Sequence, residues 1–148
     1  MTGRPNLISV LIEDHRTVEE LFTELESGPV PARAEELRDL AIAELTRHTV
    51  VEDRYLYPTV RAALPGGDTL ADRAIEEHAV LAELMAALDG VPRGDPEFDR
   101  LTSQLVTDVR GHVAEEENDL FPRLAAACTE PELIDLGERA AQVGDEPT

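Results

Sequence analysis

The sequence is poor in the residues that mark disulfide-stabilised, aromatic-rich or membrane-spanning proteins. Cys128 is the only cysteine, which excludes an intrachain disulfide and favours the reducing cytoplasm. Tryptophan is absent, and the chain has only two tyrosines and three phenylalanines. No apolar run approaches the roughly 20 residues needed to span a bilayer, and the N-terminus carries no apolar signal region. We therefore expect a cytoplasmic protein without a membrane anchor.

Basic residues are also scarce. The chain has thirteen arginines and no lysine against 32 aspartates and glutamates, which gives a formal net charge of −19. A surface of this sign repels phosphate backbones and anionic lipids, and it attracts cations. The composition therefore predicts neither a nucleic-acid partner nor a membrane partner. Metal ions and small molecules remain as the expected ligands.

Turn-forming residues divide the 148-residue chain into segments with helical periodicity. Proline and glycine cluster at 28–31, 65–68 and 90–96, and a further proline marks a break at 129–131. Between these breaks apolar residues recur three and four positions apart, and no stretch alternates with a period of two. We predict one all-α domain over residues 1–148, an up-down-up-down four-helix bundle with a short fifth C-terminal helix. The expected helices span 6–27, 32–63, 69–89, 96–127 and 131–143, with the bundle at about 6–127 and fraying from 144 to 148.

An internal repeat relates the two halves of the predicted bundle. The equivalent segments are 12–15 and 75–78, 48–52 and 112–116, and 57–58 and 121–122. Their offsets are 63, 64 and 64 residues. Helix pairs repeated in this way predict a pseudo-twofold bundle whose equivalent residues face each other across the core.

The repeat contains all four histidines of the chain, one on each long helix and each on its apolar stripe. They are His15, His48, His78 and His112. Glu52 and Glu116 follow His48 and His112 by four residues and so share their inward faces. An unpaired buried carboxylate costs several kcal/mol, so cations between the histidines and glutamates are the simplest resolution. Nitrogen and oxygen ligands without a thiolate suit iron, manganese or zinc, and the mixture favours iron.

The doubled H-x-x-x-E pattern with two further histidines resembles the hemerythrin HHE cation-binding family over roughly residues 6–127. The resemblance implies a four-helix bundle with a non-haem centre of two iron ions joined by an oxo or hydroxo bridge. It also implies that the four histidines are terminal ligands and that Glu52 and Glu116 bridge the irons. Oxygen-carrying hemerythrins use a fifth histidine one turn along the third helix, where this chain has Ala74 and Ala82.

Tyr55 is the candidate for the missing ligand and for a catalytic role. It follows Glu52 by three residues, which places it on the inward face of an α-helix. With Tyr55 bound, two six-coordinate irons would keep one open position for a small ligand. The alternatives are that Tyr55 is a core aromatic or a hydrogen-bond donor to a ligand, and that its repeat equivalent, Asp119, binds metal instead.

Three further features near the ligands have less specific interpretations. The pairs Tyr57-Pro58 and Phe121-Pro122 are expected to shape and pack one end of the bundle, since proline bends a helix. Glu44 and Asp108 lie one turn before His48 and His112. Either carboxylate could orient an imidazole or could lie in solvent.

Three functions compete for such a site. The first is disproportionation of hydrogen peroxide, the second is reversible O₂ binding, and the third is non-catalytic sensing or storage of iron, O₂ or nitric oxide. An anionic phenolate favours the ferric state, which suits peroxide better than reversible O₂ binding. The pattern with a tyrosine also resembles a group of actinobacterial hemerythrin-like proteins, for which catalase-like activity is implied. We therefore favour a catalase-like enzyme.

Overall fold

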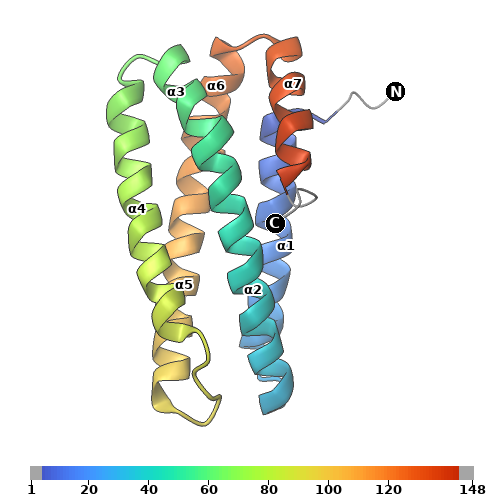
Figure 1. Ribbon diagram of the computed structural model, residues 1–148, viewed down its shortest axis with the longest axis vertical. Coiled ribbons are helices and arrows are strands. Elements are labelled where there is room, and N and C mark those ends of the chain that lie inside the picture. The colour runs from blue at the N-terminus through green and yellow to red at the C-terminus, as the bar shows by residue number, and fades with distance from the viewer. Residues whose placement is uncertain (1–4, 144–148) are drawn as a thin grey trace.

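The computed structural model describes residues 5–143 and consists of four long helices with a short one alongside (Figure 1). The four long helices are α1 (Leu7–Glu26), α2 (Pro31–Val51), α4 (Gly67–Leu88) and α5 (Pro96–Glu115). They run up and down in alternation, and no strand occurs in the described range. The predicted all-α fold is confirmed. The fraying expected for 144–148 lies outside the described residues.

Two of the long helices continue through a π-helical turn. After α2 come η1 (Glu52–Leu56) and α3 (Tyr57–Ala63). After α5 come η2 (Glu116–Leu120) and α6 (Phe121–Ala127). These turns occupy equivalent places in the two halves and were not expected from the sequence. Their i→i+5 hydrogen bonds wind the chain more widely than an α-helix does.

Local sequence explains where several helices begin. The Asn6 side chain accepts a hydrogen bond from the Ser9 amide and caps α1, while the Asn6 amide donates one to the Ser9 hydroxyl oxygen. Asp95 caps α5 in front of Pro96, a residue that suits the first helical position. Thr129 and Glu132 form the same reciprocal capping box at the start of α7 (Glu130–Ala141). These caps satisfy amide groups that a helix start leaves unpaired.

The fifth helix, α7, lies along the N-terminal part of α1 (Figure 1). Gly137 permits this approach, because a Cβ there would lie 2.6 Å from the Asn6 carbonyl carbon. Leu133 and Ala140 are buried on the inner face of α7. The short helix therefore flanks the bundle and covers the helix that carries His15.

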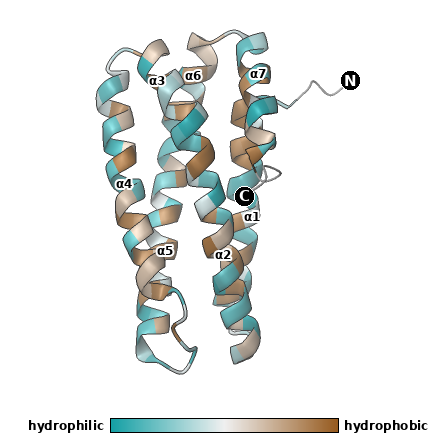
Figure 2. Cartoon of the chain, in the orientation of Figure 1, coloured by the Kyte–Doolittle hydropathy of each residue, from teal (hydrophilic) through white to brown (hydrophobic). Residues whose placement is uncertain are grey.

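Hydrophobic and hydrophilic residues are distributed around every long helix (Figure 2), and the buried ones form two separate clusters. The first, called the loop-side cluster, lies toward the α4–α5 loop and includes Phe22, Leu88 and Phe98. The second, called the α7-side cluster, includes Leu11 and Phe121. Each large apolar side chain so buried contributes about 1.5–3 kcal/mol. The two clusters leave a polar layer between them, halfway along the bundle. None of the helices in 5–143 is long and apolar enough to cross a membrane.

Candidate metal centre

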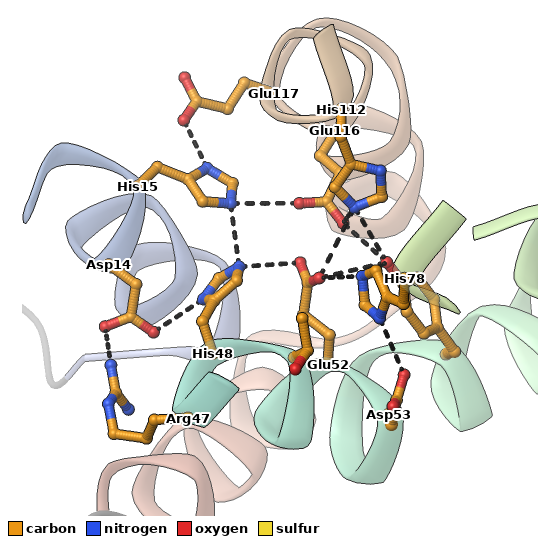
Figure 3. Close-up of polar contacts among 12 residues, drawn as sticks. Asp14, His15, Arg47, His48, Glu52, Asp53, His78, His112, Glu116 and Glu117 are labelled. Atoms are coloured by element: carbon orange, nitrogen blue, oxygen red, sulfur yellow. Dashed lines mark hydrogen bonds and ion pairs between the residues drawn. The ribbon is translucent and has the colours of Figure 1, made fainter. Parts of the chain in front are cut away.

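The polar layer contains the four histidines, one from each long helix (Figure 3). His15 lies on α1, His48 on α2, His78 on α4 and His112 on α5. Their Nε2 atoms point toward the bundle axis, where they meet one another and the glutamates. The structure thus brings together the histidines that the repeat predicted.

Glu52 and Glu116 lie between the histidines and are almost fully buried, with 0% and 3% of their surfaces exposed. Glu52 places Oε2 3.1 Å from His48 Nε2 and Oε1 2.9 Å from His78 Nε2. Glu116 places Oε1 3.1 Å from His15 Nε2 and Oε2 3.2 Å from His112 Nε2. Each carboxylate therefore reaches one histidine from each half of the chain.

The donor atoms fall into two groups. The His15–His48 group contains these two histidines with Glu52 and Glu116, and its donor atoms lie within 4.8 Å of one another. The His78–His112 group contains those histidines with Glu52 and, through its second oxygen, Glu116. The glutamates are common to both groups.

Tyr57, not Tyr55, brings a phenol into this layer. The Tyr57 hydroxyl lies 3.0 Å from Glu116 Oε2, 3.2 Å from Glu52 Oε1 and 3.3 Å from Nε2 of both His78 and His112. It thereby completes the His78–His112 group.

The prediction that Tyr55 points into the site is wrong. Tyr55 is half-buried and packs against the α7-side cluster. Tyr57 had been assigned only to packing, and its ring does belong to that cluster, but its hydroxyl extends into the polar layer.

The π-helical turn explains the error. In an α-helix the residues three and four after Glu52 share its face, which selects Tyr55. Here the Tyr57 amide donates to the Glu52 carbonyl, so the residue one turn beyond Glu52 is the fifth. Pro58 was the available signal, because a proline inside an α-helix clashes with the carbonyl four residues earlier and a wider turn relieves the clash. Pro122 follows the second π-helical turn in the same way.

The other candidates near the ligands do not reach them. Asp119 is exposed and pairs with Arg123 at 3.4 Å. Glu44 pairs with Arg47, and Asp108 accepts a hydrogen bond from Gln104. The carboxylates that contact the imidazoles were missed by sequence reasoning. They are Asp14, Asp53, Glu77 and Glu117.

The arrangement fits cations. The Nε2 atoms of His15 and His48 face each other at 3.2 Å, while both Nδ1 atoms contact carboxylates. If each Nδ1 keeps its proton for its carboxylate, two lone pairs confront each other. In that tautomer Glu52 Oε2 and Glu116 Oε1, which are buried 3.1 Å from the Nε2 atoms of His48 and His15, also have no hydrogen-bond donor, which is costly in a folded protein. A metal ion in each donor group would satisfy all of these atoms.

Without metal, protons compensate the buried carboxylates. Burial alone would lower the pKa of His48, but Glu52 and a hydrogen bond to Asp14 outweigh it and raise that pKa to about 10. Burial likewise opposes the charge of His112, yet Glu116 and Glu52 raise its pKa to about 12. Metal binding must therefore displace protons from these rings.

Burial and the two glutamates also raise the pKa of Tyr57. Its phenol is consequently neutral in the absence of a cation and acts as a hydrogen-bond donor. A bound cation would reverse this preference, because metal ions lower the pKa of the acids they coordinate.

A small cavity adjoins the histidines on the side of the loop-side cluster. It has a volume of about 20 Å³ and an apolar wall that includes Val18, Leu81, Val109 and Val113. A larger surface groove of about 360 Å³ between α1 and α5 shares three of these valines, together with His15. One layer of side chains therefore separates the inner cavity from solvent.

Comparison with known proteins gives a consistent result. Residues 6–124 match the hemerythrin HHE cation binding domain. A DNA nickase of Nostoc sp. is 33% identical over 116 residues, which are 78% of this chain but 32% of the nickase. An uncharacterized hemerythrin-like protein of Schizosaccharomyces pombe is 23% identical over 127 residues, 85% of this chain and 63% of that protein. This chain thus spans less than two thirds of either relative.

The fold has a solved counterpart. The crystal structure of a hemerythrin HHE cation binding domain-containing protein from Mycobacterium kansasii superposes with a TM-score of 0.82 at 27% identity, covering 95% of this chain and 86% of that one. The domain match, the shared bundle and the buried histidine–glutamate cluster all indicate a metal-binding protein. The chain belongs to the hemerythrin HHE cation-binding domain family.

Proposed function

We propose that the protein binds two iron ions, one in each donor group, with Glu52 and Glu116 shared between them. The support is the division of the donors into two groups with common carboxylates. Four imidazoles, two carboxylates and a phenol, with no thiolate nearby, favour iron over zinc, and manganese is the nearest competitor. The resemblance to the HHE family favours the same metal.

Tyr57 is the proposed seventh protein ligand, in place of Tyr55. Its hydroxyl lies within 3.3 Å of all four donors of the His78–His112 group, so these donors and the phenol oxygen would together hold a cation. The His15–His48 group has no corresponding phenol, because the repeat equivalent of Tyr57 is Phe121. With no phenol there, a small ligand would bind on the His15–His48 side.

The proposed reaction is the disproportionation of hydrogen peroxide, in which one molecule is oxidised to O₂ while another is reduced to water. When bound, the iron pair supplies the two-electron redox chemistry. The chain contributes an anionic phenol oxygen and two carboxylates, which favour the ferric state. The apolar cavity of about 20 Å³ limits access to molecules close to the size of water. We also propose a cytoplasmic location, where this activity would remove peroxide.

Reversible O₂ binding is the second candidate function. The same cavity supports it, since apolar walls also suit O₂. Ligation by Tyr57 argues against reversible O₂ binding, because a phenolate favours the ferric state whereas an O₂ carrier requires a stable diferrous state. Sensing or storage of iron, O₂ or nitric oxide has no separate support in the geometry.

The test combines iron analysis, optical spectra and O₂ evolution from peroxide for the wild type, Tyr57→Phe and the matched control Tyr55→Phe. We expect about two irons per chain and a phenolate-to-iron charge-transfer band, which Tyr57→Phe removes and Tyr55→Phe preserves. Peroxide turnover should change in Tyr57→Phe alone. An iron-loaded wild type that evolves no O₂ but forms a reversible O₂ adduct after reduction would exclude the enzyme and support the carrier.

The natural ligand is proposed to be a small molecule, not a nucleic acid. The resemblance to the DNA nickase covers about a third of that protein, and the net charge of −19 opposes binding to a polyanion. We expect no shift of duplex DNA in a gel at low salt, where electrostatic binding is strongest. A specific shift there would contradict the proposal.

A further inference from the structure

Each ligand histidine has a carboxylate on its outer ring nitrogen, and Figure 3 shows those of His15, His48 and His78. The four Nδ1-to-oxygen distances are 3.0 Å for His48 and Asp14, 3.1 Å for His78 and Asp53, 2.7 Å for His112 and Glu77, and 2.7 Å for His15 and Glu117. A surface rich in acidic residues would place some carboxylates near histidines by accident. It does not explain one on each of the four rings.

The four contacts also follow a regular order around the bundle. Asp14 on α1 contacts the histidine of α2, and Asp53 in η1 contacts the histidine of α4. Glu77 on α4 contacts the histidine of α5, and Glu117 in η2 contacts the histidine of α1. Each of the four chain segments therefore supplies one histidine and one carboxylate that holds the next histidine, and the order closes on itself.

The repeat preserves this order. Asp14 and Glu77 each stand immediately before a histidine, 63 residues apart, and Asp53 and Glu117 each stand immediately after a shared glutamate, 64 residues apart. Aspartate and glutamate exchange between halves, yet the contact remains. Acidic side chains of either length thus make the contact at these places.

We propose that Asp14, Asp53, Glu77 and Glu117 are positioning residues of the metal centre, here called the carboxylate ring. Each accepts a hydrogen bond from the Nδ1–H group of its histidine and so directs the Nε2 lone pair inward. Such partners orient an imidazole, fix its tautomer and raise its basicity toward the metal. A more basic set of imidazoles stabilises the more highly charged oxidation state, so the carboxylate ring should lower the reduction potential of bound iron. The inference rests on the proposed iron centre and is independent of the reaction it performs.

The ring is not uniform. Asp14 is the most buried member, with 12% of its side chain exposed, and it is held by Arg47 at 2.5 Å. Asp53 is 50% exposed and Glu117 36% exposed, and solvent weakens their contacts. We therefore expect Asp14 to matter most for metal retention. Asp53 offers the cleaner test, because its substitution leaves the packing of the bundle intact.

The test measures iron affinity and the midpoint potential of bound iron, neither of which requires peroxide turnover. Asp53→Ala and Glu117→Ala should each lower iron affinity by about 10- to 100-fold. Asp53→Asn keeps a hydrogen-bond acceptor but removes the charge, so the potential should rise with a smaller loss of affinity. Asp53→Glu reproduces the residue of the other half and should restore both quantities.

Asp108→Asn is the matched control, because it removes the same charge from a residue that contacts Gln104 and no histidine. It should leave affinity and potential at wild-type values. Equal affinity and potential in wild type, Asp53→Ala and Glu117→Ala would overturn the carboxylate ring, as would an equal shift in Asp108→Asn. Cobalt(II) binding, followed by its visible spectrum, gives the same comparison in a second metal. A protein that binds iron without peroxide turnover would sink the proposed enzyme and leave this comparison intact.

Discussion

The two halves of the metal centre differ in whether a phenol reaches the donor atoms, because the hydroxyl of Tyr57 enters one donor group. Tyr57 and Phe121 are repeat equivalents, each the first residue after a π-helical turn. The Tyr57 hydroxyl enters the His78–His112 group, whereas the Phe121 ring stacks on His15 with the centroids 5.9 Å apart. The repeat thus supplies two similar arrangements of histidine and glutamate donors, here called frames. The exchange of tyrosine for phenylalanine makes the two frames chemically different.

The unpaired oxygens show what this difference does. Glu52 Oε1 and Glu116 Oε2 lie beside the Tyr57 hydroxyl, while Glu52 Oε2 and Glu116 Oε1, in the other group, have no hydroxyl donor and face the Nε2 atoms of His48 and His15 at 3.1 Å. An unsatisfied buried acceptor costs about 1–3 kcal/mol. The half with phenylalanine therefore retains the greater demand for a ligand.

The largest expected effect comes from removing either shared carboxylate. Glu52→Ala and Glu116→Ala each take one oxygen from both donor groups and leave facing imidazoles uncompensated. We expect loss of most bound iron and a decrease of about 3–5 kcal/mol in the free energy of unfolding, as for other broken buried ion pairs. Iron analysis and denaturant titration of the two variants provide the check. Full iron stoichiometry in either one would contradict the assignment of that glutamate as a ligand.

An intermediate effect is expected when the halves are made alike. Phe121→Tyr adds a hydroxyl beside the unpaired oxygens of the His15–His48 group. By the symmetry of the repeat it should occupy the open position, so iron content should hold while peroxide turnover falls severalfold or more, a barrier increase of about 1 kcal/mol.

The double variant Tyr57→Phe/Phe121→Tyr moves the hydroxyl from one half to the other. If the two frames are equivalent, turnover and the charge-transfer band should return toward wild type. A double variant that behaves like Tyr57→Phe alone would show that the halves differ in more than this hydroxyl.

The smallest effect is a pH trend that distinguishes the metal-free and metal-loaded forms. The folded pKa values of His48 and His112, about 10 and about 12, exceed the ordinary value of 6.5. Groups with raised pKa values stabilise the fold fully below pH 6.5 and lose that contribution as pH rises toward the folded values. The apoprotein should therefore lose thermal stability between pH 6.5 and 10. The iron-loaded form should hold its metal more tightly over the same rise, because the rings must release protons to bind. Melting curves of both forms at several pH values would reveal opposite trends, and parallel trends would contradict the proton–metal exchange.

The fold followed from the sequence because its signals are local and periodic. Proline, glycine and capping residues mark the helix ends. The helices α1 and α4, and the continuous segments α2–η1–α3 and α5–η2–α6, begin and end within about two residues of the predicted limits. The repeat placed the six histidine and glutamate donors together for the same reason, since a helical face is set by spacing alone.

The remainder of the site depended on departures from ideal spacing and on contacts between helices. Tyr55 was selected by α-helical counting, which fails where the turn is π-helical. The partners of the imidazoles lie on neighbouring helices, so counting back one turn to Glu44 and Asp108 did not find them. Such contacts depend on how helices are rotated against each other, which a single sequence does not state.

The π-helical turns make the site more sensitive to changes of length than to changes of residue. Deleting one residue between positions 53 and 56 could close the turn as an ordinary α-helix with the tyrosine four residues after Glu52, still on the same face. Deleting both residues 54 and 55 would leave every proposed ligand in the gene, yet it would bring the tyrosine only three residues after Glu52. Everything after it would then rotate by one residue, about 100°, and the hydroxyl would leave the metal layer. A frame-preserving deletion of this kind would erase the distinction between the two halves without altering a single donor.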